Sequence, residues 1–281
     1  MKLGVQIRPT DYSLDPREIG RMVEAHGFES LFFPEHTHIP LATRSLEPDD
    51  PDWLETCMHM LDPFIALAAV ATVTERLRLG TGVSLIVEHD PITLAKEVAT
   101  LDLLSSGRFL FGVGAGWNRA EMIDHGVEPS QRWALLREHV LAMKALWTEE
   151  RAEFHGRFVD FGPAYQWPKP VRKPHPPVLI GGEGPGVLDR VLDYGDGWMP
   201  NEHQGVDRRV IELRTRLAEL GREPLPVTIY SVAWDRSAVE RYRAIGVERC
   251  VFTIPGFDAA SIERGLRDLW KLAGDLSSGI E

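Results

Sequence analysis

The sequence predicts an α/β fold, a (β/α)8 TIM barrel, from three observations. Strand-like and helix-like segments alternate along all 281 residues, with eight of each kind. Glycines concentrate where the strands end, as they do where backbone approaches a ligand. The length suits one large barrel, so we expect residues 1–281 to form a single domain. An open doubly wound sheet is the alternative.

The expected strands are short apolar runs rich in β-branched residues. They are Lys2–Arg8, Ser30–Pro34, Arg76–Ser84, Phe109–Val113, Pro177–Gly181, Gly197–Pro200, Pro226–Ser231 and Cys250–Ile254. The expected helices carry apolar residues at helical spacing. They are Asp15–His26, Pro63–Thr74, Pro91–Leu104, Gln131–Glu149, Gly186–Tyr194, Val206–Leu220, Ala238–Ile245 and Ala259–Ala273. Three of them begin with an aspartate followed by proline, a strong start signal.

Two segments interrupt the alternation. Residues 39–61 follow the second strand, are rich in Pro, Asp and Thr, and contain Trp53, Met58 and Met60. A lid that forms part of a substrate pocket and a surface insertion are equal alternatives for this segment. Residues 150–176 follow the fourth strand, and phenylalanines flanking Gly156 predict a small hairpin there. The prolines that come next exclude a regular helix.

Composition excludes several classes of partner. A net charge of −11 argues against nucleic acid or an anionic membrane, although it leaves room for a small anionic ligand. The two cysteines, Cys57 and Cys250, are far apart, which indicates free thiols in a reducing compartment. No signal-peptide pattern is present at the start, and the longest apolar run, 64–73, is too short to span a bilayer. We therefore expect a cytoplasmic protein.

Two glycine-rich turns, Gly112–Gly116 and Gly181–Gly186, each follow a strand and precede a helix. Free backbone N–H groups in such turns bind anions, helped by the helix dipole. The second turn is the better phosphate site because Pro185 pre-sets the helix start. Glu183 must then point away from the phosphate. Neither turn has the GxGxxG spacing of a dinucleotide-binding domain.

His36 ends the second strand, where an imidazole could exchange a proton near neutral pH. Taken alone, this position favours a surface or structural histidine. Tryptophans at strand ends or in long loops suit the walls of a site for a planar ligand; they are Trp53, Trp117, Trp167 and Trp198. Tryptophans inside helical patterns are expected in the core; they are Trp133, Trp147 and Trp270. Spacing typical of a metal site is absent, so no metal is expected.

Three blocks occur in order at strand ends: RLRLGTGV, ITLAKEVATLDLLSSGRFLFGVGAGW and PKPVRKPHPPVLIGGEGPGVLDRVLDYGDGWMP. Together they resemble the luciferase-like monooxygenase superfamily, which comprises flavin- and deazaflavin-dependent (β/α)8 oxidoreductases. The likeness covers nearly the whole chain. The last block is most similar to the branch that uses coenzyme F420. The resemblance therefore implies hydride transfer between F420 and a small organic substrate, with an FMN-dependent monooxygenase or oxidoreductase as the alternative.

The resemblance also implies roles for individual residues. Gly82-Val83 matches a bulge, often with a non-proline cis peptide, behind the central ring of the cofactor. The first glycine turn is implied to line the cofactor pocket, with Gly114, Ala115, Gly116 and Trp117. The second is implied to hold the cofactor phosphate, with Gly181, Gly182, Glu183, Gly184 and Pro185. His36 matches an active-site histidine of the deazaflavin-dependent members, which reverses the interpretation made from that residue alone.

One departure from the family pattern is clear. Some sugar-phosphate dehydrogenases of the family carry a glutamate where this chain has Trp117, so their substrate is not transferred to it. Glu121, one helical turn onward, is a weak substitute. Arg172 and Lys173 are candidate contacts for an anionic cofactor tail. An apolar or aromatic substrate and a homodimer are expected, and a non-catalytic cofactor carrier or a metal-dependent hydrolase are the rival classes.

Overall fold

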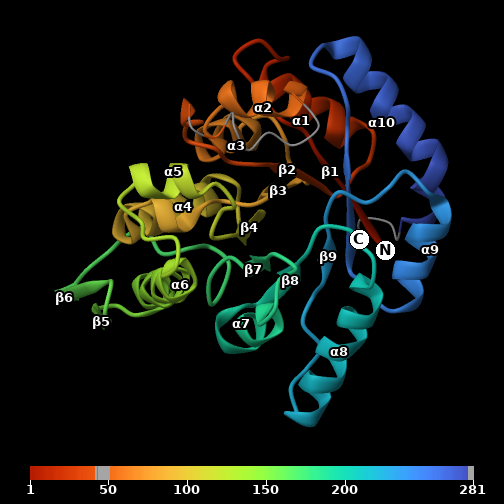
Figure 1. Cartoon of the computed structure of the whole chain (residues 1–281). Coiled ribbons are helices and arrows are strands. Elements are labelled where there is room, and N and C mark those ends of the chain that lie inside the picture. The colour runs from red at the N-terminus through yellow and green to blue at the C-terminus, as the bar shows by residue number, and fades with distance from the viewer. Residues whose placement is uncertain (42, 44–50, 278–281) are drawn as a thin grey trace.

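The structure, a computed structural model, describes residues 1–41, 43 and 51–277. Strands and helices alternate along the chain (Figure 1). The strands are β1 (Lys2–Gln6), β2 (Ser30–Phe33), β3 (Arg78–Thr81), β4 (Phe109–Val113), β5 (Ala152–His155), β6 (Asp160–Ala164), β7 (Val178–Gly181), β8 (Gly197–Met199), β9 (Thr228–Ile229) and β10 (Arg249–Thr253). The helices are α1 (Pro16–Ala25), α2 (Pro51–Met58), α3 (Pro63–Ala71), α4 (Pro91–Leu104), α5 (Arg119–Asp124), α6 (Arg132–Thr148), α7 (Val187–Tyr194), α8 (Val206–Glu219), α9 (Arg236–Ala244) and α10 (Ala259–Ala273), with short 3-10 turns η2 (Ile86–Glu88) and η3 (Gly274–Leu276).

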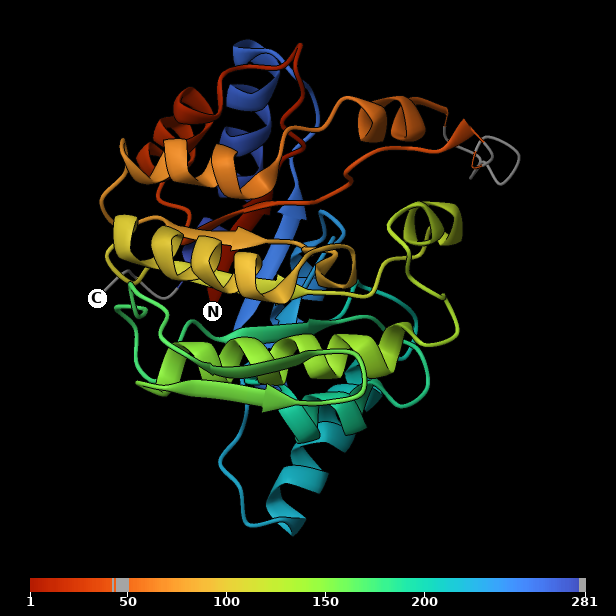
Figure 2. The same cartoon turned by 90° about the vertical axis from the view of Figure 1, so that its left-hand side faces the viewer.

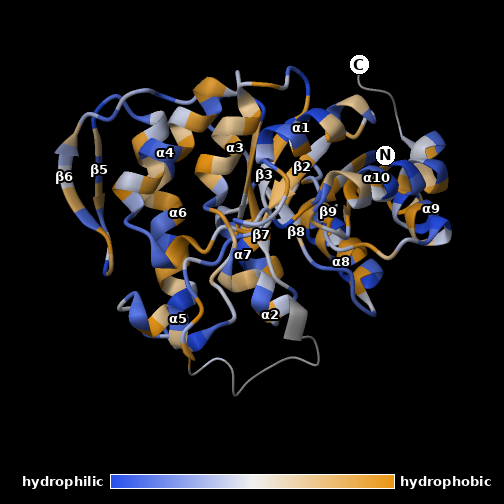
Figure 3. Cartoon of the chain, turned by 90° about the horizontal axis from the view of Figure 1, so that it is seen from above, coloured by the Kyte–Doolittle hydropathy of each residue, from blue (hydrophilic) through white to orange (hydrophobic). Residues whose placement is uncertain are grey.

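Eight parallel strands form a barrel in the order β8-β7-β4-β3-β2-β1-β10-β9. Single parallel bridges, Trp198 with Val227 and Asn201 with Tyr230, join β8 to β9 and nearly close it. Seen from above, helices surround the central strands (Figure 3). The predicted (β/α)8 barrel is therefore confirmed, and the doubly wound alternative is wrong.

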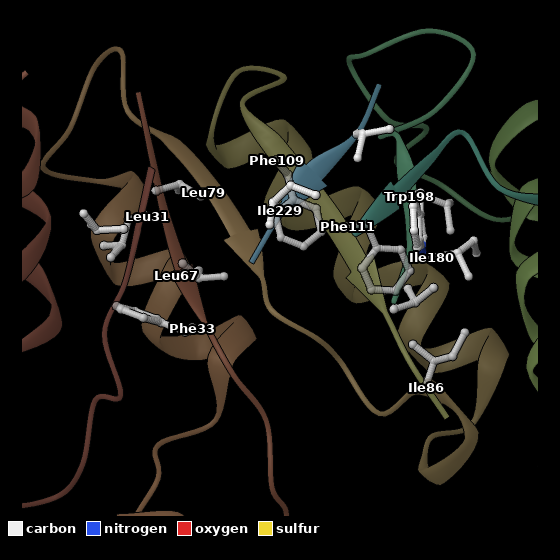
Figure 4. Close-up of a cluster of buried hydrophobic side chains, with 14 of the residues drawn as sticks. Leu31, Phe33, Leu67, Leu79, Ile86, Phe109, Phe111, Ile180, Trp198 and Ile229 are labelled. Atoms are coloured by element: carbon white, nitrogen blue, oxygen red, sulfur yellow. The ribbon is translucent and has the colours of Figure 1, made fainter. Parts of the chain in front are cut away.

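Successive side chains of a strand point to opposite faces of the sheet, so each barrel strand contributes to two cores. One core fills the barrel, and the other lies between the strands and the surrounding helices. Inward-facing side chains fill the barrel; they are Phe32, Leu110, Leu179, Met199, Tyr230 and Val251. Their neighbours along the strands face the helices and belong to a larger cluster (Figure 4); among them are Leu31, Phe33, Phe109, Phe111, Ile180, Trp198 and Ile229. The sheet therefore has no solvent-facing side, and its open end is left for a ligand.

The predicted helix starts are confirmed. Asp15, Asp62 and Asp90 each cap a helix by accepting a hydrogen bond from a backbone N–H, and proline follows each of them. The strand predicted over 76–84 is shorter than expected. It ends at Thr81, before the cis peptide bond between Gly82 and Val83 that the resemblance implied.

Both predicted insertions are present. The hairpin is confirmed as antiparallel β5 and β6 beside α6 (Figure 2). The first insertion holds α2, which the sequence analysis did not predict, and part of that insertion lies outside the described residues. The short helix α5 was also missed. It begins after Asn118, whose side chain accepts hydrogen bonds from the N–H groups of Ala120 and Glu121.

Figure 2 shows α2 and α5 projecting on the same side of the molecule. That side is the carboxyl end of the barrel strands, because α2 follows β2 and α5 follows β4. In the described part of the chain, no helix has the length and apolarity needed to cross a membrane.

Gly112 tests how tightly the strands pack. A Cβ atom there would fall 2.1 Å from the carbonyl oxygen of Thr81 and 2.5 Å from Cε of Met199. Gly112→Ala must therefore push β3 and β4 apart, and we expect it to lower the free energy of unfolding by about 1–3 kcal/mol. The control is Gly162→Ala in β6, where no atom lies within 4 Å of the added methyl group. Urea unfolding measures both variants; equal effects would contradict this account.

Candidate functional site

Two adjoining cavities open at the carboxyl end of the strands. The first, here the glycine cavity, has about 310 Å³ and is lined by both glycine turns together with Trp133, Met199 and Tyr230. The second, here the histidine cavity, has about 300 Å³ and is lined by His36, Glu35 and Gln6, among others. The two share lining residues and so form one groove across the barrel mouth; these are Gly82, Val83, Leu85, Trp117, Asn201 and Tyr230. Parallel barrels bind their ligands at this end.

The structure brings most of the predicted cofactor residues together. Lining the glycine cavity are Gly82, Val83, Gly114, Ala115, Gly116, Trp117, Gly181, Gly182, Glu183 and Gly184. Pro185 is exposed and does not line it. The Glu183 carboxylate accepts hydrogen bonds from the backbone N–H (2.7 Å) and the side-chain amide (3.0 Å) of Asn201. It is therefore held by a residue just beyond β8 rather than by the N–H groups of its own turn.

The floor of the groove is formed by Gly82 and Tyr230. A Cβ atom on residue 82 would lie only 2.1 Å from the hydroxyl oxygen of Tyr230, so only glycine fits beside this ring. That hydroxyl is buried and has no hydrogen-bond partner among the described residues. Burial raises the pKa of Tyr230, so the hydroxyl keeps its proton. The floor of the groove thus contains a buried hydrogen-bond donor, the Tyr230 hydroxyl, that has no acceptor among the described residues.

His36 lines the histidine cavity, and two side chains hold its imidazole in place. Its Nδ1 lies 2.8 Å from Oε2 of Glu121, which is fully buried, and its Nε2 lies 3.3 Å from the indole N–H of Trp117. An indole can only donate, and a carboxylate only accepts, so these partners place the imidazole proton on Nδ1. Nε2 is then the unprotonated nitrogen, and it accepts the hydrogen bond from the indole N–H of Trp117. The sequence analysis ranked Glu121 as a weak candidate and did not foresee this pair.

Glu121 is fixed independently of His36. Its other oxygen, Oε1, accepts a hydrogen bond of 3.0 Å from the backbone N–H of Thr37. Trp53 and Trp117 enclose the imidazole, with ring centroids 6.2 and 5.7 Å from that of His36. These two tryptophans therefore form an aromatic wall, as predicted.

Glu88 is a second buried carboxyl group behind the groove, and the sequence analysis overlooked it. Its side chain is 1% exposed, and neither oxygen has a hydrogen-bond partner among the described residues. Burial raises the pKa of Glu88 to about 8, and the carboxylates of Glu121 and Glu35 contribute to the rise. Glu88 therefore favours its protonated form at neutral pH.

Three arginines that the sequence analysis also missed surround the second glycine turn. The guanidinium carbons of Arg190 and Arg132 lie 3.9 and 5.0 Å from the ring centroid of Trp133. Arg209 donates hydrogen bonds to the carbonyl groups of Glu183 and Gly184. In the described chain none of the three forms an ion pair. We name Arg132, Arg190 and Arg209 the arginine cluster.

The arginine cluster stands where positive charge is unfavourable. Arg132 is the first residue of α6, and Arg190 and Arg209 are each the fourth residue of their helices, close to the positive end of the dipole. Burial, and to a smaller extent the other two arginines, lowers the pKa of Arg190. This placement was the signal that the sequence analysis could have used, because cations at three helix starts favour binding of an anion.

Several sequence predictions about this region are wrong. Trp198 is buried against the helices, because it occupies an outward position of β8, and Trp167 is exposed near Lys96 of α4. Trp133, which was predicted in the core, is partly buried against its edge and also lines the glycine cavity. Trp147 is buried in the core, as predicted.

Arg172 and Lys173 also lie elsewhere. The backbone N–H of Arg172 donates to Asp102, and Arg172 packs beside Gly107, just before β4 begins. This is the amino end of the barrel, opposite the groove, so neither residue is a tail contact. Among the described residues, no group of three or more His, Cys, Asp and Glu side chains could hold a metal ion.

Comparison with known proteins places this geometry among relatives. The family model described as luciferase-like monooxygenase matches residues 12–261. An uncharacterized protein of Mycobacterium tuberculosis is 42% identical over 261 residues, covering 91% of this chain and 92% of that protein. The structure resembles that of the monooxygenase RslO1 from Streptomyces bottropensis, with a TM-score of 0.80 and 21% identity over 98% of both chains. It also resembles the coenzyme F420-dependent tetrahydromethanopterin reductase of Methanopyrus kandleri, with a TM-score of 0.71 and 16% identity over 97% of both.

The protonated Glu88 predicts a pH dependence of stability. Because its folded pKa is raised, its contribution to the free energy of unfolding is greatest below the ordinary glutamate pKa and is lost as pH rises through about 8. Stability should therefore fall between about pH 5 and about pH 9. Glu88→Gln, which cannot ionise, should flatten the profile. Thermal melts across this range measure it, with Glu219→Gln at the exposed end of α8 as control; an unchanged slope in Glu88→Gln would refute the assignment.

Proposed function

The chain belongs to the luciferase-like monooxygenase family, and on that premise we propose that it is a coenzyme F420-dependent oxidoreductase acting on a small organic substrate. The observation that supports this most is the groove, which combines the Gly82-Val83 bulge with the second glycine turn and has the arginine cluster beside it. Family membership supports an enzyme that uses a flavin or deazaflavin. The choice between the two cofactors rests on the charge at the end of the groove.

The residues present fit a tricyclic cofactor with a phosphate. Tyr230 offers an unpaired hydroxyl at the bulge. A Cβ on Gly182 or Gly184 would meet no atom within 4 Å, so this turn exposes backbone to the cavity. Trp117 and Trp133 supply aromatic surface along the groove. These residues would hold the ring system over the bulge and the phosphate against the second turn.

The arginine cluster favours the deazaflavin. FMN ends at its phosphate, whereas F420 continues into an anionic tail. Backbone N–H groups of the turn already suit one phosphate. Three further guanidinium groups without carboxylate partners exceed that need. Arg132 and Arg190 lie over Trp133, which lines the cavity, and Arg209 binds the carbonyl groups of the turn. A ligand with several anionic groups would neutralise them and the helix starts together.

When bound, the deazaflavin supplies hydride transfer, and the protein supplies orientation and proton handling. Nε2 of His36 carries the lone pair of the ring at the edge of the histidine cavity, so we assign it the proton that accompanies the hydride. It takes up that proton once the indole N–H of Trp117 releases it. Glu121 is a positioning residue: it holds Nδ1–H, fixes the tautomer and stabilises the imidazolium once Nε2 is protonated. Trp53 and Trp117 shield the pair from water.

An FMN-dependent monooxygenase is the second candidate. The likeness to the Streptomyces monooxygenase over nearly the whole chain favours it. Its cofactor would use the same bulge and turn, and most of the arginine cluster would be left without a ligand.

Paired titrations of the cofactor-free protein with F420 and FMN test the cofactor, with quenching of tryptophan fluorescence as the signal. We expect micromolar or tighter binding of F420 and at least about tenfold weaker binding of FMN. Arg190→Gln should weaken the binding of F420 about tenfold, because it removes a charged hydrogen bond to the ligand. The same variant should bind a truncated deazaflavin, which lacks the phosphate and the tail, as tightly as the unaltered protein does.

The matched control is Arg137→Gln on α6, whose side chain is exposed and already paired with Asp193 at 2.6 Å. Tighter binding of FMN than of F420 would replace the proposal with the second candidate. Oxygen consumption would then be the next assay.

Turnover of His36→Ala and Glu121→Gln tests the proton assignment. His36→Ala should lower kcat roughly 10²–10⁴-fold with the cofactor still bound. Glu121→Gln should lower kcat less and shift its pH profile, because the neutral amide no longer stabilises the imidazolium. Unchanged turnover in His36→Ala, with normal cofactor affinity, would remove His36 from the mechanism.

A further inference from the structure

A third cavity continues the groove beyond His36. It has about 480 Å³ and shares Arg8 and Trp53 with the histidine cavity, so the two are continuous. Tyr12 and Phe257 form its apolar side, with ring centroids 5.2 Å apart in an edge-to-face arrangement. Ile254 and Pro255 extend that surface. The volume is within the range of small-molecule sites.

Arg8 is the charged group at the junction of these two cavities. It follows β1, two positions after Gln6, whose side chain hydrogen-bonds inside the barrel mouth to Ser231 and Thr253. Ile7 between them is buried in the outer core, so alternation directs Arg8 toward the groove. Within the described residues, its guanidinium has neither an ion pair nor a hydrogen bond.

Carboxylates near Arg8 are engaged elsewhere. Glu55 lines the third cavity, but its Oε1 lies 3.4 Å from Nε2 of His59. Asp11 lies 2.9 Å from Nδ1 of the same histidine. The net charge of −11 makes an arginine without a carboxylate partner at the mouth of a cavity more notable. A guanidinium presents a planar set of donors that matches a carboxylate in a bidentate pair.

We infer that the substrate is an apolar carboxylic acid whose carboxylate binds Arg8. Its hydrocarbon part would lie along Tyr12 and Phe257 or Trp53, and its reacting carbon would lie in the histidine cavity near Nε2 of His36. This inference rests on the proposed function for the reaction. The anion site itself depends only on Arg8 and its cavity.

Two acid–amide pairs serve as probes: phenylacetate with phenylacetamide, and hexanoate with hexanamide. Each pair differs in charge and hardly in shape. Titrations with NMR detection, on both cofactor-free and F420-loaded protein, give the dissociation constants. We expect at least one acid to bind about tenfold or more tightly than its amide, as a charge-assisted bidentate pair requires.

Arg8→Gln should abolish that preference and leave amide binding unchanged. Arg8→Lys, which keeps the charge but loses the fork, should retain part of it and also guards against a folding defect in the first variant. Arg137→Gln is again the control. Equal binding of acids and amides by the unaltered protein, no saturable binding of either acid, or an acid preference that survives Arg8→Gln would each overturn the inference.

The outcome separates the two proposals. If F420 does not bind but the acid preference depends on Arg8, the cofactor assignment fails and the anion site stands. If F420 binds and Arg8→Gln has no effect, the cofactor assignment stands and the substrate inference fails.

Discussion

The two-sided burial of the barrel strands is the constraint on which the rest of the structure depends. Along a strand, side chains alternately point into the barrel and pack under the helices. A shift of one residue would therefore move every side chain of that strand from one core to the other. The carboxyl ends of the strands are thereby fixed relative to one another. His36, Gly82 and the second glycine turn come from different strand ends, and their juxtaposition follows from this register.

Small residues at those ends decide where a ligand can fit. Because Gly82 has no side chain, the Tyr230 ring fits against it, and the Tyr230 hydroxyl is buried beneath the groove. The barrel interior is packed below this level by Phe32, Leu110 and Leu179. The cavity is thus a shallow groove over a filled barrel rather than a pore. A flat ring system suits that shape, whereas a bulky globular ligand does not.

Charge is distributed unevenly along the groove. Basic groups without carboxylate partners stand at both ends, with the arginine cluster beside the glycine turn and Arg8 beyond the histidine cavity. Acidic groups lie behind the middle, where Glu121 pairs with His36 and burial raises the pKa of Glu88. An acidic protein therefore presents two local regions of unpaired positive charge, separated by the His36–Glu121 pair. This distribution of charge is the basis on which we propose an anionic cofactor and an anionic substrate.

The sequence by itself determined the elements and the ligand end of the barrel. Strand and helix patterns, aspartate–proline helix starts and the glycine turns are local features, and they predicted the fold. Together with the family resemblance they predicted eleven cofactor residues, of which only Pro185 does not line the glycine cavity. Partners from distant segments were decided only by the tertiary structure. Glu121 meets His36, and three helix starts bring the arginine cluster together, while Arg172 lies at the opposite end of the barrel. The physical reason is that such encounters depend on strand register and helix packing, which no local pattern encodes.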